Sequence, residues 1–139
     1  MRWTSTSLAC LTLASIVLGC APVAPPGTVV RVTDVKSLGG TWAGTLIDSA
    51  NMGTPLRLVI NPDGTYRAQF GDTSANGTIV LRPDGQLAFT MTSAAGLLSL
   101  VESSSTATLY NRGGRRVLVG NGRVGWRENP FSWEVTEEN

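Results

Sequence analysis

The sequence contains no histidine, and this absence removes a large group of chemistries. Histidine is the commonest general base in enzymes and the commonest protein ligand of transition metals. The chain also has only two cysteines, Cys10 and Cys20, and both lie close to its start. A domain built from the later residues therefore has no thiol and no disulfide, and its stability must come from packing alone.

An excess of charge of one sign is absent as well. The chain has 11 basic and 10 acidic side chains, which gives a formal net charge of +1. This balance gives no support for binding to nucleic acid or to a bulk membrane surface. The sequence also lacks a Gly-x-Ser-x-Gly elbow and a paired cysteine motif. We therefore expect a protein that is not an enzyme, with no catalytic residues, no metal site and no cofactor.

A mostly apolar stretch, Leu8–Gly19, follows the basic residue Arg2 near the start of the chain. Its twelve residues are too few for a membrane-spanning helix, which needs about 20, but they fit the apolar core of a signal peptide. The stretch ends in Val-Leu-Gly before Cys20, and a proline-rich segment follows. This order resembles the signal and lipobox of bacterial lipoproteins, although Leu18 stands where alanine or serine is more usual. An ordinary secretory signal with an incidental cysteine is the alternative.

The resemblance implies that residues 1–19 are a lipoprotein signal peptide and that Cys20 becomes a lipidated N-terminus. Residues 20–32 are then the lipidated cysteine and a flexible tether, and residues 33–139 form the folded domain. Ala21 is not the aspartate that holds such proteins at the inner membrane. The resemblance therefore implies a lipid-anchored protein of the bacterial cell envelope, at the outer membrane and facing the periplasm.

Short alternations of apolar and polar residues recur along the chain, whereas no segment shows sustained helical periodicity. Turn sequences separate them: Pro-Asp-Gly at 62–64 and 83–85, Gly-Gly at 113–114, and Asn-Gly at 76–77 and 121–122. The predicted strands are 29–32 (an edge strand), 40–46, 56–60, 66–70, 79–81, 87–91, 97–102, 106–110, 117–119, 124–127 and 131–135. We expect an all-β fold, a small antiparallel up-and-down β-barrel of about eight strands.

Residues 33–39 are predicted to form a short helical turn that Thr33 caps and Gly39 ends in the left-handed conformation. This turn leads into Gly-Thr-Trp at 40–42. The combination resembles the opening of the calycin barrels, which include the lipocalins. The resemblance implies that Trp42 closes one end of the barrel and stacks on an arginine from a late strand. Four arginines remain open for that position: Arg115, Arg116, Arg123 and Arg127.

Aromatic residues at alternating strand positions are the candidates for a binding site. They line a ligand cup or simply fill the core, because a barrel of eight strands is just wide enough for either. The predicted ligand-binding or barrel-closing residues are Trp42, Tyr66, Phe70, Phe89, Arg123 and Arg127. The Gly-x-Gly-x-x-Gly pattern at 120–125 is interpreted as a hairpin turn, because no helix follows it to face a phosphate.

Five arginines between residues 112 and 127 are followed by acidic residues from 128 to 138. The first interpretation is a basic patch for phosphate or lipid headgroups. The second is a set of charge pairs between neighbouring strands. On function we expect a non-catalytic binding module for a small apolar molecule or lipid. The alternative is a structural or protein-interaction lipoprotein of the envelope, similar to protease inhibitors, with a solid core.

Overall fold

A computed structural model describes residues 27–95, 103–124 and 129–139 of the chain. Cys20, the predicted signal peptide, the predicted strand 97–102 and Arg127 lie outside the described residues. No helix in the described part of the chain is long and apolar enough to cross a membrane. The elements in chain order are β1 (Thr28–Val29), a 3-10 helix η1 (Val35–Leu38), β2 (Gly40–Ile47), β3 (Gly53–Ile60), β4 (Thr65–Phe70), β5 (Thr73–Leu81), β6 (Leu87–Ala95), β7 (Ser103–Arg112), β8 (Arg115–Val124) and β9 (Asn129–Glu137).

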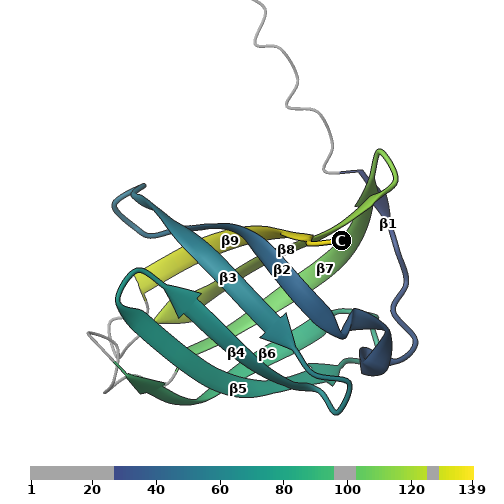
Figure 1. Ribbon diagram of the computed structural model, residues 1–139, viewed down its shortest axis with the longest axis horizontal. Helices are drawn as coiled ribbons and strands as arrows, with labels where there is room; N and C mark the ends of the chain where they lie inside the picture. Colours follow the sequence, from purple (N-terminus) through teal and green to yellow (C-terminus); the bar gives the residue numbers. More distant parts are fainter. Residues whose placement is uncertain (1–26, 96–102, 125–128) are drawn as a thin grey trace, which may run out of the picture.

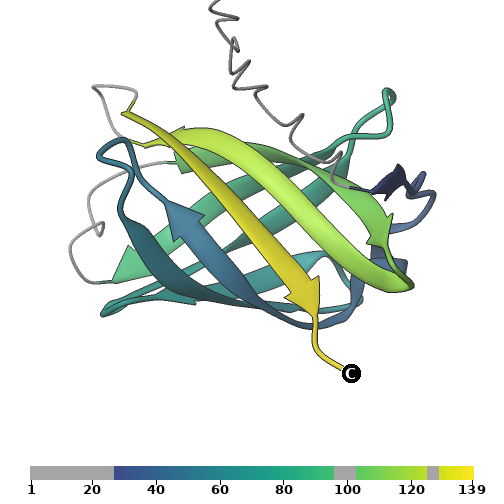
Figure 2. The ribbon, with the colours of Figure 1, turned by 90° about the horizontal axis from the view of Figure 1, so that it is seen from above.

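Strands β2 to β9 form a closed barrel in which each strand pairs antiparallel with the next one in the sequence. The sheet closes on itself because β9 also pairs with β2, from Trp42 opposite Glu137 to Ile47 opposite Ser132. Figures 1 and 2 show the tilted strands wrapping around a common axis. The prediction of an eight-stranded antiparallel up-and-down barrel is confirmed.

The short strand β1 completes the wall of the barrel where β6 is too short to do so. β6 pairs with β7 only as far as Leu87 opposite Ala107. Beyond that point the N–H of Val30 donates to the carbonyl oxygen of Leu109 at 2.8 Å, and β1 pairs with the end of β7. This pairing protects a strand edge that would otherwise be open to association. The expected tether, 20–32, therefore includes residues that the structure places against the barrel.

Alternate residues of each strand face the barrel interior, as the period of a half-buried strand requires. The interior residues form one hydrophobic core. Its buried members are Val32, Leu38, Trp42, Leu56, Leu58, Ile60, Tyr66, Ala68, Ala75, Ile79, Leu87, Phe89, Ala107, Leu109, Leu118, Trp133 and Val135.

The two Pro-Asp-Gly turns form as the sequence predicts. Asp63 accepts a hydrogen bond from the N–H of Thr65 at 2.9 Å through its side chain, and Gly64 has a φ of 85°. Asp84 makes the same kind of bond in the second turn, where Gly85 has a φ of 83°. Aspartate closes the turn through its side chain, and glycine takes a positive φ without steric cost.

The two Asn-Gly predictions are wrong, because residues 76–77 lie inside β5 and residues 121–122 lie inside β8. These positions need a small side chain rather than a turn. A Cβ on Gly77 would lie 2.6 Å from two ring carbons of Tyr66, and a Cβ on Gly122 would lie 2.8 Å from Cζ of Phe131. The glycines therefore make room for aromatic rings inside the barrel.

The predicted helical turn is present as η1, with two differences at its ends. Asp34, not Thr33, caps the helix by accepting a hydrogen bond from the N–H of Lys36 at 2.9 Å. Gly39 has a φ of −55° and is not left-handed. Asp34 is the better cap because its carboxylate reaches the free N–H groups two residues ahead.

Gly120 offers a test of this packing. A Cβ at this position would overlap the indole ring of Trp133. We expect Gly120→Ala to lower the free energy of unfolding by about 1–3 kcal/mol, because the ring must move. In the control Gly53→Ala, the new methyl group meets only Cγ2 of Thr45, at 3.3 Å, and the change should stay within about 0.5 kcal/mol. Urea unfolding measures both, and equal losses would contradict this account.

Candidate ligand-binding cavity

The barrel has two different ends, which the alternating direction of the strands defines. The connections β2–β3 and β4–β5, at residues 48–52 and 71–72, lie at one end, called here the mouth end (Figure 1). The connections β3–β4, β5–β6 and β7–β8 lie at the other end, together with η1. This second end is called the closed end.

The helix η1 covers the closed end and fixes the position of Trp42. The side chains of Leu38 and Trp42 are both fully buried. The indole N–H of Trp42 donates to the carbonyl oxygen of Leu38 at 3.0 Å. This bond satisfies a buried donor and also one of the carbonyl groups at the end of the helix.

Arg116 completes the closed end with four contacts. Its guanidinium group donates to both carboxylate oxygens of Glu137, at 2.7 and 2.8 Å, and to the carbonyl oxygen of Ser37 at 2.7 Å. The same group lies 5.2 Å from the ring centroid of Trp42. A planar cation matches both a carboxylate and an indole face, which lysine cannot do as well. The arginine over Trp42 is therefore Arg116.

Arg123 does not take part in closing this end. It lies near the end of β8 that is opposite Arg116, at the mouth end, and it is exposed. Arg116 was one of four candidates in the sequence and could not be selected from it, because the register between β8 and β9 decides which arginine meets Glu137. The role proposed for Arg127 lies outside the described residues.

A cavity of about 510 Å³ occupies the mouth half of the barrel. Its wall is mainly apolar, with polar groups toward the rim. The apolar lining residues are Leu46, Leu56, Leu58, Tyr66, Ala68, Phe70, Ala75, Phe89, Met91, Val124, Pro130, Phe131 and Trp133. The polar lining residues include Asp48, Ser49, Thr54, Asp72, Thr73, Ser103, Ser105 and Asn129.

Three aromatic rings in contact run across the cavity wall. The rings of Tyr66 and Phe89 have centroids 5.4 Å apart, and Phe89 meets the ring of Trp133 edge-on at 5.1 Å. The indole N–H of Trp133 donates to the hydroxyl oxygen of Ser105 at 3.3 Å. Ring pairs at these distances and angles stabilise one another beyond simple burial.

The structure brings together Tyr66, Phe70 and Phe89 from the predicted set, and all three line the cavity. Trp42 lies in the closed end and does not line it. Trp133 and Phe131 were not in the predicted set, although both contribute to the wall. Both residues alternate with polar residues on the last strand, and this alternation was the sequence signal that identifies them as facing the interior.

Small side chains create the space for the cavity. Ala68 on β4 and Ala75 on β5 stand directly opposite each other, both buried and both lining the cavity. Two methyl groups leave a gap where two larger residues would fill the barrel. The closed half, in contrast, holds large side chains such as Trp42, Leu38 and Leu118, which are fully buried.

The charged groups among the described lining residues are the carboxylates of Asp48 and Asp72. Asp48 also orders the β2–β3 turn, since its side chain accepts from the N–H groups of Ala50 and Met52 at 2.9 Å each. Burial raises the pKa of Tyr66 to about 12, so its phenol stays neutral at physiological pH. Among the described residues, no three acidic or cysteine side chains lie together as metal ligands would.

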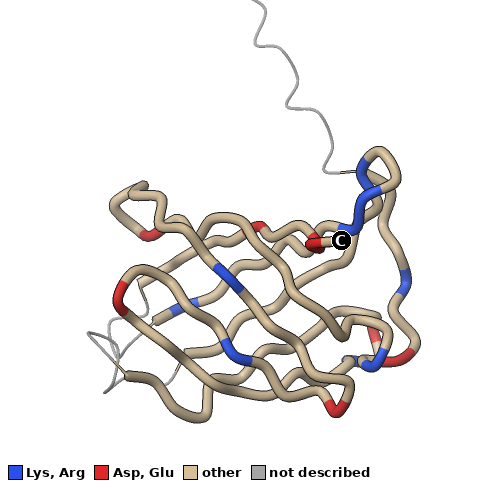
Figure 3. The backbone as a smooth tube through the Cα atoms, viewed as in Figure 1, with Lys and Arg blue, Asp and Glu red and all other residues tan. Residues whose placement is uncertain are grey.

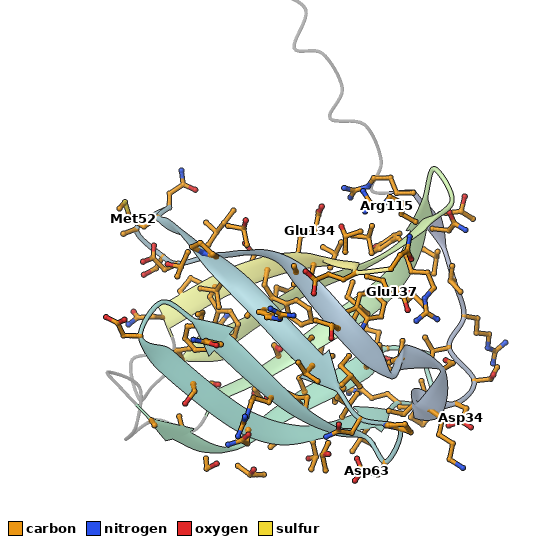
Figure 4. All side chains as sticks on the ribbon, viewed as in Figure 1. Asp34, Met52, Asp63, Arg115, Glu134 and Glu137 are labelled. Carbon is orange, nitrogen blue, oxygen red and sulfur yellow. The ribbon has the colours of Figure 1, made fainter. Side chains whose placement is uncertain are left out.

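Two of the clustered arginines form ion pairs with the acidic residues near the C-terminus. Arg112 donates to both carboxylate oxygens of Glu134, at 2.7 and 3.2 Å, on the exposed outer face. This bond raises the pKa of Arg112. Together with the pair between Arg116 and Glu137, it supports the interpretation as charge pairs between strands close in the sheet. Figure 4 labels Glu134 and Glu137 along β9.

Comparisons of the chain with protein-family models, curated proteins and solved structures give no match. The barrel is compatible with a lipocalin-like fold through its own geometry: eight antiparallel strands in sequence order, a helix at one end, and an arginine over Trp42 of the first barrel strand.

Arg116 tests the closed end. We expect Arg116→Ala to lower the free energy of unfolding by about 2 kcal/mol, because the carboxylate of Glu137 and the ring of Trp42 lose their partner. The matched control is Arg115→Ala, one residue away and exposed, which should change stability by less than about 0.5 kcal/mol. Thermal or urea unfolding measures the difference, and similar losses in both variants would show that Arg116 has no special role.

Tyr66 gives a pH test. Its pKa is about 12 in the folded protein against 10.0 for a free tyrosine, so the unfolded chain loses this proton first. The free energy of unfolding should therefore fall by up to about 3 kcal/mol as the pH rises from about 10 to about 12. Tyr66→Phe should remove that part of the fall. The same pH dependence in both proteins would contradict the burial of this phenol.

Proposed function

We propose that the protein binds a small apolar molecule or lipid in the mouth-end cavity and performs no chemistry on it. The observation that carries this proposal is a cavity of about 510 Å³ in a barrel whose other end is filled by side chains. Ligand sites in proteins commonly measure about 300–1,000 Å³ and are mainly apolar, with a few polar groups that orient the ligand.

The lining suggests the size and orientation of the ligand. At about 30 Å³ for each water-sized group, the cavity holds roughly 17 such groups at most. Leu58, Ala75 and Phe89 offer apolar contact to one part of the molecule. Ser103 and Ser105 place hydroxyl groups on the same wall, where they would accept or donate a hydrogen bond to a polar part.

The proposal includes the location that the N-terminal sequence suggests. A lipid on Cys20 would hold the barrel in the bacterial envelope, at the outer membrane and facing the periplasm. The lipobox resemblance of the sequence up to Cys20 supports this location.

A second candidate function is contact with another envelope protein. Met52 is 64% exposed and Ile47 is 38% exposed, and both lie at the mouth end. Exposed apolar side chains near a rim suit a protein contact. In this case the cavity would have no ligand of its own, and a protein partner would cover the rim.

Ligand binding can be tested by native mass spectrometry of residues 28–139, purified gently from a bacterial periplasm. We expect an extra mass of a few hundred daltons that is lost on denaturation. Ala75→Phe should abolish it, because the new ring fills the cavity. The matched control is Ser74→Phe. Ser74 directly precedes Ala75 on β5, and its side chain is exposed and faces outward. This variant should keep the ligand.

A bare mass for the unmodified domain, with no uptake from an added panel of lipids, would contradict ligand binding and favour the protein contact. Equal ligand loss in both phenylalanine variants would also count against the cavity as the site. Both variants must first show cooperative unfolding, so that misfolding is not taken for a blocked site.

The anchor has a separate test in Cys20→Ser. The unmodified chain, expressed in a bacterium, should sediment with membranes and carry acyl mass on its first residue. The serine variant should lose both, because serine at this position has no thiol to receive the lipid. A serine variant that keeps its membrane fraction and its acyl mass would contradict the anchor.

A further inference from the structure

The described chain enters the barrel at its closed end, opposite the cavity. Thr28 pairs with Asn111, at the end of β7, and a Cβ on Gly27 would overlap the carbonyl oxygen of Asn111. Gly27 therefore lies beside the hairpin that joins β7 to β8. Figures 1 and 2 show β1 at the closed end, far from the β2–β3 connection at the mouth.

The segment before Gly27 is short compared with the height of the barrel. Seven residues lead from Cys20 to Gly27, and any chain of seven residues reaches about 25 Å at most when fully extended. β8 has 10 residues, so a tilt of about 40° makes the barrel roughly 25 Å high. The mouth would therefore meet the bilayer only with this segment at full stretch, whereas the closed end meets it at any extension of the segment.

The charge of the β7–β8 tip agrees with this placement. Arg112 and Arg115 flank the tip, beside the point of chain entry (Figures 3 and 4). Arg112 pairs with Glu134, whereas Arg115 is exposed and forms no ion pair within the described part of the chain. The other turns of the closed end carry Asp63 and Asp84, so the basic character is local to this tip. The mouth end carries the carboxylates of Asp48 and Asp72 together with the exposed Arg123.

We infer that the barrel stands on its closed end, with the β7–β8 tip on anionic lipid headgroups and the mouth facing away from the membrane that anchors it. This inference rests on the proposed lipid on Cys20. Its consequence concerns the source of the ligand. A mouth that faces the aqueous phase receives its ligand from a soluble carrier or from an opposing partner, and not directly from the anchoring bilayer.

The orientation can be measured with single-cysteine variants of the full lipidated protein in vesicles. Cys10 leaves with the signal peptide and the thiol of Cys20 is used by the lipid, so an added cysteine is the only site for a fluorescent label. Met52→Cys places the label at the mouth, and Pro83→Cys places it in the β5–β6 turn at the closed end. The vesicles contain phosphatidylcholine with nitroxide-labelled headgroups, with or without phosphatidylglycerol.

We expect the label on Pro83→Cys to lose most of its emission and the label on Met52→Cys to keep most of it. Phosphatidylglycerol should increase this difference, and adding Arg115→Gln should remove the increase. Equal quenching at both positions, or stronger quenching at Met52→Cys, would overturn the orientation. If the protein carries no acyl group on Cys20, both the orientation and the lipid anchor are overturned.

Ligand uptake, measured separately on residues 28–139 in solution, keeps the two proposals distinguishable. Uptake together with a membrane-facing mouth would refute only the orientation. The expected orientation without uptake would refute only the binding function.

Discussion

The asymmetry of this barrel depends on the contacts of one guanidinium group. Arg116 joins the last strand through Glu137, the 3-10 helix through the carbonyl oxygen of Ser37, and the second strand through the ring of Trp42. The helix and the second strand are adjacent in the sequence, but the last strand is about 90 residues away, and all three meet at the closed end. The pairing of β9 with β2 joins the ends of the meander, and side-chain contacts of this kind add to it at the closed end. They also fix which end of the barrel is filled and which is left open.

The distribution of side-chain volume then divides the interior into two halves. Large residues fill the closed half, while the facing alanines on β4 and β5 leave space in the mouth half. Glycines in β5 and β8 have a different effect, because each gives its space to an aromatic ring of the neighbouring strand. Small residues thus have two effects: the glycines make room for aromatic rings in the wall, and the alanines hollow the barrel. An aromatic wall around an open space is suited to holding a ligand.

The sequence predicts the fold class well because alternation and turn residues are local signals. The Pro-Asp-Gly turns formed as predicted, since their geometry needs only the aspartate side chain and a glycine with positive φ. The Asn-Gly pairs were wrongly predicted to be turns. Their glycines instead leave room for an aromatic ring of the neighbouring strand, that of Tyr66 in one case and that of Phe131 in the other. Arg116 could not be selected from four arginines because the register between β8 and β9 decides which of them meets Glu137.

One end of the barrel is sealed and the other is open, and two indole N–H groups report on this difference directly. That of Trp42 bonds to the carbonyl oxygen of Leu38 in the closed end, and that of Trp133 bonds to Ser105 beside the cavity. Hydrogen exchange followed by NMR should show the Trp42 proton protected as strongly as the slowest backbone amides, and the Trp133 proton exchanging much faster. Equal protection of both protons, or faster exchange at Trp42, would contradict a barrel that is closed at this end and hollow at the other.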